Sequence, residues 1–328
     1  MPKSEHKRPV SRESRSSQNA DDSPRPFLKW AGGKRQLLPR LRRFYPDQFG
    51  NYFEPFVGSG AVFFDLHARG LLKGRDALLI DNSQDLVGCY RAVRDQAEVL
   101  IRGLRTLAKE RQSDPAVHYY DVRDRRFNPM RSHLRDQEPR PLADAYTPEL
   151  AAMLIYLNRT GFNGLFRQNA RGGFNVPVGR YVNPRICDAA NLRNAAAALS
   201  RTRTRILLGD FSTVLGQAKV DDFVYFDPPY APLSATASFT SYTSGGFGEE
   251  EQVRLQKVVI DLANRGCKVV LSNSTAPLIE RLYERDETAR RAGLSAHRVP
   301  ARRAINSKAS ARGQVLEYII TNVPERGE

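Results

Sequence analysis

Residues 223–230 read FVYFDPPY, an apolar run that ends in an acidic, proline-rich turn. The first four residues have the length and composition of a buried strand, so Asp227 would stand at its carboxyl end. Pro228 and Pro229 stiffen the turn, and Tyr230 adds an aromatic ring. Such a site can grip a flat ring and hold its exocyclic nitrogen against an acceptor. The tetrapeptide alone is equally typical of a structural turn, because Asp and Pro are common turn residues.

Short apolar runs bounded by Gly, Asp or Asn recur along the chain. Runs of this kind suit the strands of a parallel sheet, which are buried on both faces. The sequence predicts strands at 52–56, 77–81, 205–209, 223–226, 268–272 and 314–321. Helical segments separate them, which indicates a doubly wound α/β sheet with ligands at the carboxyl ends of its strands.

Two of the segments between these strands show helical spacing, residues 94–112 and 249–265. In the second, positions three to four residues apart would form one face, and Gly266 would end the helix. That face would comprise Val253, Gln256 or Lys257, Ile260, and Ala263 or Asn264.

Residues 112–200 break the α/β rhythm because they are rich in Arg, Asn and Gly, with helix-like pieces at 148–158 and 187–199. We therefore expect three parts. Residues 26–111 and 201–328 would form one catalytic α/β domain, and residues 112–200 would be inserted between its second and third strands. Residues 1–25 are polar and carry a small positive excess, which predicts a disordered basic arm.

The net charge of +15 suggests a polyanionic partner, most simply nucleic acid. A generally basic soluble surface is the alternative. Residues 151–205 contain nine arginines, no lysine and one acidic residue, and so hold more than half of the excess. This concentration favours a dedicated basic surface.

Composition also bears on metals and membranes. The cysteines Cys89, Cys187 and Cys267 are scattered without a CxxC pair, so neither a zinc ribbon nor a disulfide framework is indicated. The chain has no apolar run of bilayer length and no signal-peptide pattern. We expect a cytoplasmic monomer without a metal and without a membrane segment.

Residues 54–60, EPFVGSG, follow the first predicted strand. Gly58 and Gly60 would let the backbone turn tightly and approach a ligand. The second strand ends in Asp81, a position from which a carboxylate can accept both ribose hydroxyls. The third glycine of a pyrophosphate-binding loop is absent, which points away from NAD and towards a nucleoside ligand.

Residues 27–34, FLKWAGGK, precede the first strand. Trp30, the only tryptophan, could cover a ligand, and Lys34 supplies a cation for a carboxylate. A structural loop is the alternative, and the spacing of a P-loop is missing. Residues 158–181 interleave Arg, Asn, Gly and aromatic residues, a pattern that suits contacts to phosphates and base edges. A mobile glycine-rich loop would have a similar composition.

The motifs KWAGGK, EPFVGSG, the basic insertion and DPPY occur in an order that resembles the Dam family of DNA adenine-N6 methyltransferases, the alpha group of the D12 class. The resemblance covers nearly all of residues 26–322 and is closest at 158–181 and 227–237. It implies a Rossmann-like sheet with an inserted, mainly helical target-recognition domain. It also implies S-adenosylmethionine as donor, double-stranded DNA as substrate, GATC as recognition site, and a bacterial or phage-type protein associated with the nucleoid.

The resemblance assigns roles to individual residues. Those expected at the cofactor are Trp30, Ala31, Gly32, Lys34, Glu54, Phe56, Gly58, Gly60, Asp81, Asp210, Phe211 and Asp227. Those expected at the DNA are Lys29, Arg159, Phe162, Asn163, Leu165, Arg167, Pro177 and Arg180. Phe162 stands where the family has an intercalating tyrosine, so its ring can stack but the hydroxyl is lost. Asp210 stands at a variable position of the family.

The chemistry expected at DPPY is direct methyl transfer to an amine. The Asp227 carboxylate and the Pro228 carbonyl would accept the two amine protons, within a turn stiffened by Pro229, and Tyr230 would stack on the base. Asp227 would also stabilise the positive charge that develops on nitrogen. Two alternatives stay open: an amino-methyltransferase of other specificity, at another adenine site or cytosine N4, and a catalytically inactive DNA-binding regulator. The sequence also leaves open whether a restriction nuclease accompanies the protein.

Overall fold

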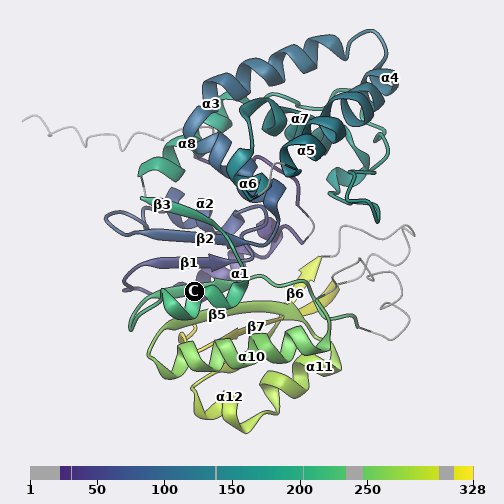
Figure 1. Ribbon diagram of the computed structural model, residues 1–328. Coiled ribbons are helices and arrows are strands. Elements are labelled where there is room, and N and C mark those ends of the chain that lie inside the picture. Colours follow the sequence, from purple (N-terminus) through teal and green to yellow (C-terminus); the bar gives the residue numbers. More distant parts are fainter. Residues whose placement is uncertain are drawn as a thin grey trace, which may run out of the picture.

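The structure is a computed structural model that describes residues 23–30, 32–136, 139–201, 203–233, 247–302 and 314–327. The arm at 1–22 and the predicted site residue Ala31 lie outside the described residues. Within the described part, seven strands form one sheet in the order β3-β2-β1-β4-β5-β7-β6 (Figure 1). The strands are β1 (Tyr52–Pro55), β2 (Ala77–Asp81), β3 (Thr204–Leu208), β4 (Phe223–Phe226), β5 (Lys268–Ser274), β6 (Ser295–Arg302) and β7 (Gln314–Thr321).

The six predicted strands are confirmed within one or two residues, and β6 was missed. Its sequence, SAHRVPAR, has no apolar run, because β6 is an edge strand that pairs only with β7. Strands β1 to β5 are parallel, whereas β7 runs antiparallel to both β5 and β6. The parallel part confirms the doubly wound α/β expectation.

The sheet opens between β1 and β4. The chain leaves β1 towards β2 and β3 on one side and returns through β4 towards β5 on the other, so this is the topological switch point. Here only Tyr52 with Phe223 and Phe53 with Val224 are in register, whereas β4 pairs with β5 along its whole length. The carboxyl ends of β1 and β4 therefore diverge and leave a crevice, the usual ligand position in such sheets.

Both faces of the central strands are buried, which explains their unbroken apolar sequences. In β4, Phe223 and Tyr225 join one core, and Val224 and Phe226 join the other. The first core contains residues of four helices, α2 (Ala61–Ala68), α3 (Gln84–Glu110), α7 (Pro148–Thr160) and α8 (Ala189–Arg201). The second contains Leu255 and other residues of α10 (Glu249–Asn264). Figure 1 shows α3 to α8 gathered beyond β2 and β3, and α10 to α12 along the opposite side of the sheet.

The α-helices are α1 (Leu38–Leu41), α2 (Ala61–Ala68), α3 (Gln84–Glu110), α4 (Pro115–Tyr120), α5 (Asn128–Arg135), α6 (Leu142–Ala145), α7 (Pro148–Thr160), α8 (Ala189–Arg201), α10 (Glu249–Asn264), α11 (Pro277–Ile279) and α12 (Glu287–Arg291). Short 3-10 helices are η1 (Lys34–Gln36), η2 (Arg42–Phe44), η4 (Phe162–Gly164) and η5 (Phe211–Gly216), and π-helical turns are η3 (Asp121–Phe127) and η6 (Glu280–Glu284). No described helix is long and apolar enough to cross a bilayer.

Two helix expectations need correction. Helix α3 begins at Gln84, ten residues before the expected start, and is bent at Gln96. Its first turns are buried nearly all round, so they lack the one-sided spacing that marks a surface helix. In α10 the buried face passes through Leu255, Val259 and Leu262, and of the expected positions only Gln256 and Ala263 belong to it. Val253 and Ile260 are only half-buried, and Lys257 and Asn264 are exposed.

A buried ion pair ties the inserted helices to the sheet. Arg131 of α5 donates two hydrogen bonds to Asp85 at the start of α3, at 2.6 and 2.8 Å. A third bond from Arg131 reaches the Gly172 carbonyl, and Tyr146 also donates to Asp85. Arg131 and Asp85 are only 6% and 2% exposed, so their charges depend on one another.

We predict that Arg131→Met lowers the free energy of unfolding by about 3–5 kcal/mol, because it leaves the Asp85 carboxylate buried without its partner. The double variant Arg131→Met/Asp85→Leu should recover most of this loss. Arg125→Met is the control, since its pair with Asp121 at 3.8 Å is solvent-exposed. Urea unfolding measures all three, and equal effects of Arg131→Met and Arg125→Met would contradict the prediction.

Candidate active site

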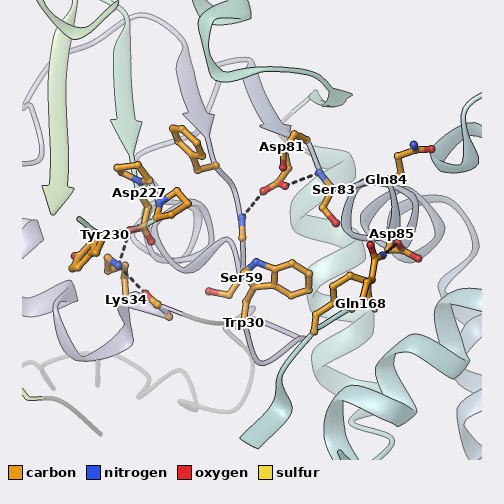
Figure 2. Close-up of a pocket in the computed structure, with 18 of the residues that line it drawn as sticks. Trp30, Lys34, Ser59, Asp81, Ser83, Gln84, Asp85, Gln168, Asp227 and Tyr230 are labelled. Atoms are coloured by element: carbon orange, nitrogen blue, oxygen red, sulfur yellow. Dashed lines mark hydrogen bonds and ion pairs between the residues drawn. The ribbon is translucent and has the colours of Figure 1, made fainter. Parts of the chain in front are cut away.

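A cavity of about 1060 Å³ lies in the crevice at the switch point. Figure 2 shows Lys34, Asp227 and Tyr230 converging at one end, Asp81 further along, and Gln168 at the other end. A smaller cavity of about 390 Å³ adjoins it and is lined by Phe211, Phe247 and Arg254, among others. Phe56, Asp81 and Asn82 line both cavities. The crevice therefore offers two adjoining chambers, a large one that holds Lys34 and Asp227 and a small one lined by aromatic rings.

Asp227 projects from the end of β4 into the large chamber, with its side chain 20% exposed. The Lys34 ammonium lies 2.6 Å from its Oδ1 atom, and the Ser272 hydroxyl donates to the same oxygen at 3.2 Å. Burial raises the pKa of Asp227, and the Lys34 charge opposes that rise. The lysine thereby favours the ionised carboxylate at neutral pH.

The DPPY turn is held from behind by buried amides and a hydroxyl. Gln252 of α10 donates to the Pro229 carbonyl at 2.8 Å, and Asn273 of β5 accepts from the Ala231 amide at 3.1 Å. Asn273 also donates to Gln252, and the Ser274 hydroxyl donates to the Ala231 carbonyl. These three side chains are at most 2% exposed, so the turn cannot shift without breaking bonds in a dry environment.

The loop after β1 brings its backbone close to the same chamber. Phe56, Gly58 and Gly60 all have positive φ, at 66°, 49° and 66°. A Cβ atom on Gly58 would lie 3.2 Å from the Trp30 ring, so glycine permits this approach. The Gly58 amide donates to Asp81 at 3.2 Å. Burial raises the pKa of Asp81, and the Ser83 and Gly58 amides oppose the rise.

The small chamber is built from stacked rings. Phe56 and Phe211 stack with centroids 5.3 Å apart, and Phe247 meets both edge-on. The Arg254 guanidinium lies over Phe211 at 4.2 Å and pairs with Asp210 at 2.6 Å. This chamber suits a flat aromatic ligand, and Asp81 stands where it joins the large chamber.

The inserted part reaches the large chamber through a hairpin-like segment, residues 161–179. It is closed by bridges between Gly161 and Val178 and between Gln168 and Phe174. Its Phe166 stacks on Trp30 at 5.5 Å, so one wall of the chamber belongs to this segment. Within it and next to it, the expected contact residues Phe162, Asn163, Arg167, Pro177 and Arg180 are exposed.

The remaining expected DNA residues lie nearer the protein interior. Lys29 is half-buried, and its ammonium donates to the Tyr181 hydroxyl at 3.3 Å. Leu165 is half-buried and packs against the core. Arg159 donates to the Phe27 carbonyl at 2.8 Å, and burial lowers the pKa of its guanidinium. Arg159 therefore supports the segment that leads to Trp30 rather than facing outward.

A family model described as D12 class N6 adenine-specific DNA methyltransferase matches residues 30–305. The chain belongs to this family. It is 40% identical over 298 residues to the type II methyltransferase M1.LlaDCHI of Lactococcus lactis subsp. cremoris, covering 91% of this chain and 95% of that protein. It is 39% identical to the type II methyltransferase M.MjaIII of Methanocaldococcus jannaschii, covering 91% and 99%. It is 33% identical to the DNA adenine methylase of Escherichia coli K12, covering 92% and 96%.

This D12 methyltransferase is a DNA adenine-N6 methyltransferase with a Rossmann-like fold. Most of the residues expected at the cofactor line the chambers: Trp30, Gly32, Lys34, Phe56, Gly58, Asp81, Asp210, Phe211 and Asp227. All four residues of the DPPY motif line the large one. Glu54 and Gly60 lie behind the wall, where Glu54 accepts bonds from the Tyr52 hydroxyl and the Phe63 amide. Within the described residues, no cluster of His, Cys, Asp and Glu is placed to hold a metal ion.

Sequence reasoning missed several residues of the D12 methyltransferase site. Ser272, Asn273 and Gln252 position the DPPY turn, yet they are spread over β5 and α10, and no motif marks them. Asn158 lies in the stretch 158–181 that was expected to contact DNA, but it is buried and donates to the carbonyls of Lys29 and Gly164. Its signal is a lone amide within the apolar helix α7, which predicts a buried hydrogen-bonding role.

Glu54 couples the stability of the methyltransferase to pH. Burial raises its pKa from 4.5 to about 8, the bond from Tyr52 opposes the rise, and the nearby Asp227 charge adds to it. Between these two values the folded protein holds a proton that the unfolded chain releases. The stability contributed by this group therefore falls as pH rises through that window.

We predict that Glu54→Gln removes this dependence. The difference in free energy of unfolding, variant minus wild type, should increase steadily from about pH 5 to about pH 8, by at most ~1.4 kcal/mol per pH unit. Urea titrations across this range measure the difference. Glu149→Gln, at an exposed position, should keep the wild-type slope. Parallel curves for wild type and Glu54→Gln would refute the assignment.

Proposed function

We propose that this methyltransferase transfers a methyl group from S-adenosylmethionine to N6 of an adenine flipped out of duplex DNA, within GATC. The observation that carries the proposal is the position of Asp227. Its carboxylate enters a chamber large enough for a base, beside the Tyr230 ring, and that chamber joins a second one of aromatic character. This arrangement places an acceptor for an amine next to a separate nucleoside site.

The residues present fit S-adenosylmethionine. Phe56 and Phe211 offer ring faces for its adenine, and the Asp81 carboxylate can accept its ribose hydroxyls. Lys34 supplies a cation for its carboxylate group. When bound, this donor supplies an electrophilic methyl group on a sulfonium.

Asp227 and Pro228 then act on the target amine. The adenine amino group is a weak nucleophile because its lone pair is delocalised into the ring. Two acceptors for its protons, the Asp227 carboxylate and the Pro228 carbonyl, favour a pyramidal nitrogen with a localised lone pair. Asp227 stabilises the positive charge that develops on N6, and its raised pKa suits it to take the proton that N6 then releases.

The target base must leave the duplex, because Watson–Crick pairing hides N6. Flipping costs a few kcal/mol. Phe162 is 49% exposed on the segment 161–179 and offers a ring that can fill the space left in the stack. We assign residues 112–200 to target recognition and residues 26–111 and 201–328 to catalysis, in a cytoplasmic enzyme that acts as a monomer.

We predict that Asp227→Ala reduces the methylation rate by about 10³-fold or more, because it removes the acceptor and the stabilising charge. Binding of GATC duplexes in mobility-shift assays should be retained. The assay uses tritiated donor followed by base analysis, which also distinguishes N6-methyladenine from N4-methylcytosine. Asp221→Ala, at an exposed turn, should leave the rate unchanged. Near-wild-type turnover by Asp227→Ala would remove this residue from the mechanism.

Two exposed arginines should differ in role, with Arg167 reading a base and Arg180 binding a phosphate. We predict that Arg167→Ala loses about 1–3 kcal/mol of discrimination at one base pair of GATC. Arg180→Ala should instead weaken binding uniformly and reduce the slope of log affinity against log salt by about 1. Binding of duplexes substituted at each GATC position, measured across a salt series, tests both. If the two variants behave alike, the assignment of Arg167 to base reading fails.

A further inference from the structure

The Lys34 ammonium already occupies a position beside Asp227 and Tyr230. Its side chain is only 7% exposed. The Nζ atom lies 2.6 Å from Asp227 Oδ1, 2.8 Å from the Gly32 carbonyl, and 4.3 Å from the centroid of the Tyr230 ring. Two acceptors and one ring face therefore surround it, which matches the three protons of an ammonium group. Figure 2 shows the three side chains meeting at one end of the chamber.

A target adenine needs the same surroundings. Its amine must donate to Asp227, and its ring must lie against Tyr230. A nitrogen atom already stands 2.6 Å from the carboxylate and over that ring, so a base cannot take this place until Lys34 has moved. The ammonium thus stands in for the amino group of the substrate.

Electrostatics keep Lys34 there. Asp227 shares its neighbourhood with two further carboxyl groups: its charge adds to the raised pKa of Glu54, and Glu317 in turn raises the pKa of Asp227. Tyr230 donates its hydroxyl to Glu317 at 2.9 Å. Removing the ammonium from beside Asp227 and Glu317 is unfavourable unless another anion attracts it.

We propose that Lys34 is a gate for the target base, an inference that rests on the function proposed above. With no donor present, Lys34 fills the position of the target amine. When the donor binds, its carboxylate attracts the Lys34 ammonium away from Asp227. The adenine then enters only a site that already holds its methyl donor.

The structure allows this movement. Lys34 is the first residue of the short helix η1 and follows Gly32 and Gly33, of which Gly32 has φ at +79°. Its flexible four-carbon side chain changes direction by rotation alone, because only the ammonium end is held by polar contacts. Trp30 and Gly58, expected at the donor, line the same chamber.

The test uses a GATC duplex with 2-aminopurine at the target position, whose fluorescence rises when the base leaves the stack. With wild type, we expect little rise without cofactor and a large rise with S-adenosylhomocysteine. Saturating 5′-methylthioadenosine, which lacks the carboxylate, should give little rise. Lys34→Met should give at least half of the full rise with no cofactor at all.

Two further variants distinguish loss of the gate from misfolding of Lys34→Met. Asp227→Asn keeps the lysine but removes the charge that holds it, and should also flip the base without cofactor. Arg35→Met changes the adjacent, exposed residue of η1 and should behave as wild type. Calorimetry should show S-adenosylhomocysteine binding to Lys34→Met weakened by about tenfold or more, and methylthioadenosine binding unchanged.

The gate is overturned if Lys34→Met and Asp227→Asn show no rise in fluorescence without cofactor. It is also overturned if methylthioadenosine raises the fluorescence with wild type as much as S-adenosylhomocysteine does. Methylation of an unmodified GATC duplex by the same wild-type preparation separates the two claims. Adenine methylation without gating refutes the gate alone. Absence of adenine methylation refutes the proposed function.

Discussion

A carboxylate at the open end of a parallel sheet needs a counter-charge, and the contact between Lys34 and Asp227 provides it. The strand order creates the need, because β1 and β4 diverge at the switch point and leave Asp227 facing a cavity rather than a neighbouring strand. The same divergence lets the segment around Lys34 approach from outside the sheet. The polar site is thus a direct consequence of the topology.

The segment 161–179 and the site around Asp227 share walls. Phe166 stacks on Trp30, and Gln168 donates to Asp85 at 3.4 Å, so the segment touches the large chamber at two places. Asp85 is in turn bound to Arg131 of α5. The segment is therefore joined to the chamber by direct side-chain contacts.

Sequence patterns predicted this fold where local rules suffice. The buried strands are apolar without interruption because both of their faces are covered, and the DPPY and EPFVGSG motifs lie at strand ends because only there is a ligand accessible. The edge strand β6 is polar and so carried no signal. The network of Gln252, Asn273 and Ser274 joins residues that are brought together only by folding, and no spacing along the chain reveals it. For the same reason the high pKa of Glu54 follows from its burial and neighbours, not from its motif.

The distribution of charge on the protein favours phosphates at its surface and a neutral base in the chamber. The protein carries a net charge of +15, with many exposed arginines in the inserted part, whereas the end of the large chamber gathers Asp227 and Glu317 around a single lysine among the described residues that line it. Phosphates are attracted to the outside and repelled from the inside, while a neutral base can enter. A donor that carries a sulfonium and an amino group favours the acidic interior. In the gate proposed above, Lys34 is the cation that leaves Asp227 when this donor binds, before the base enters.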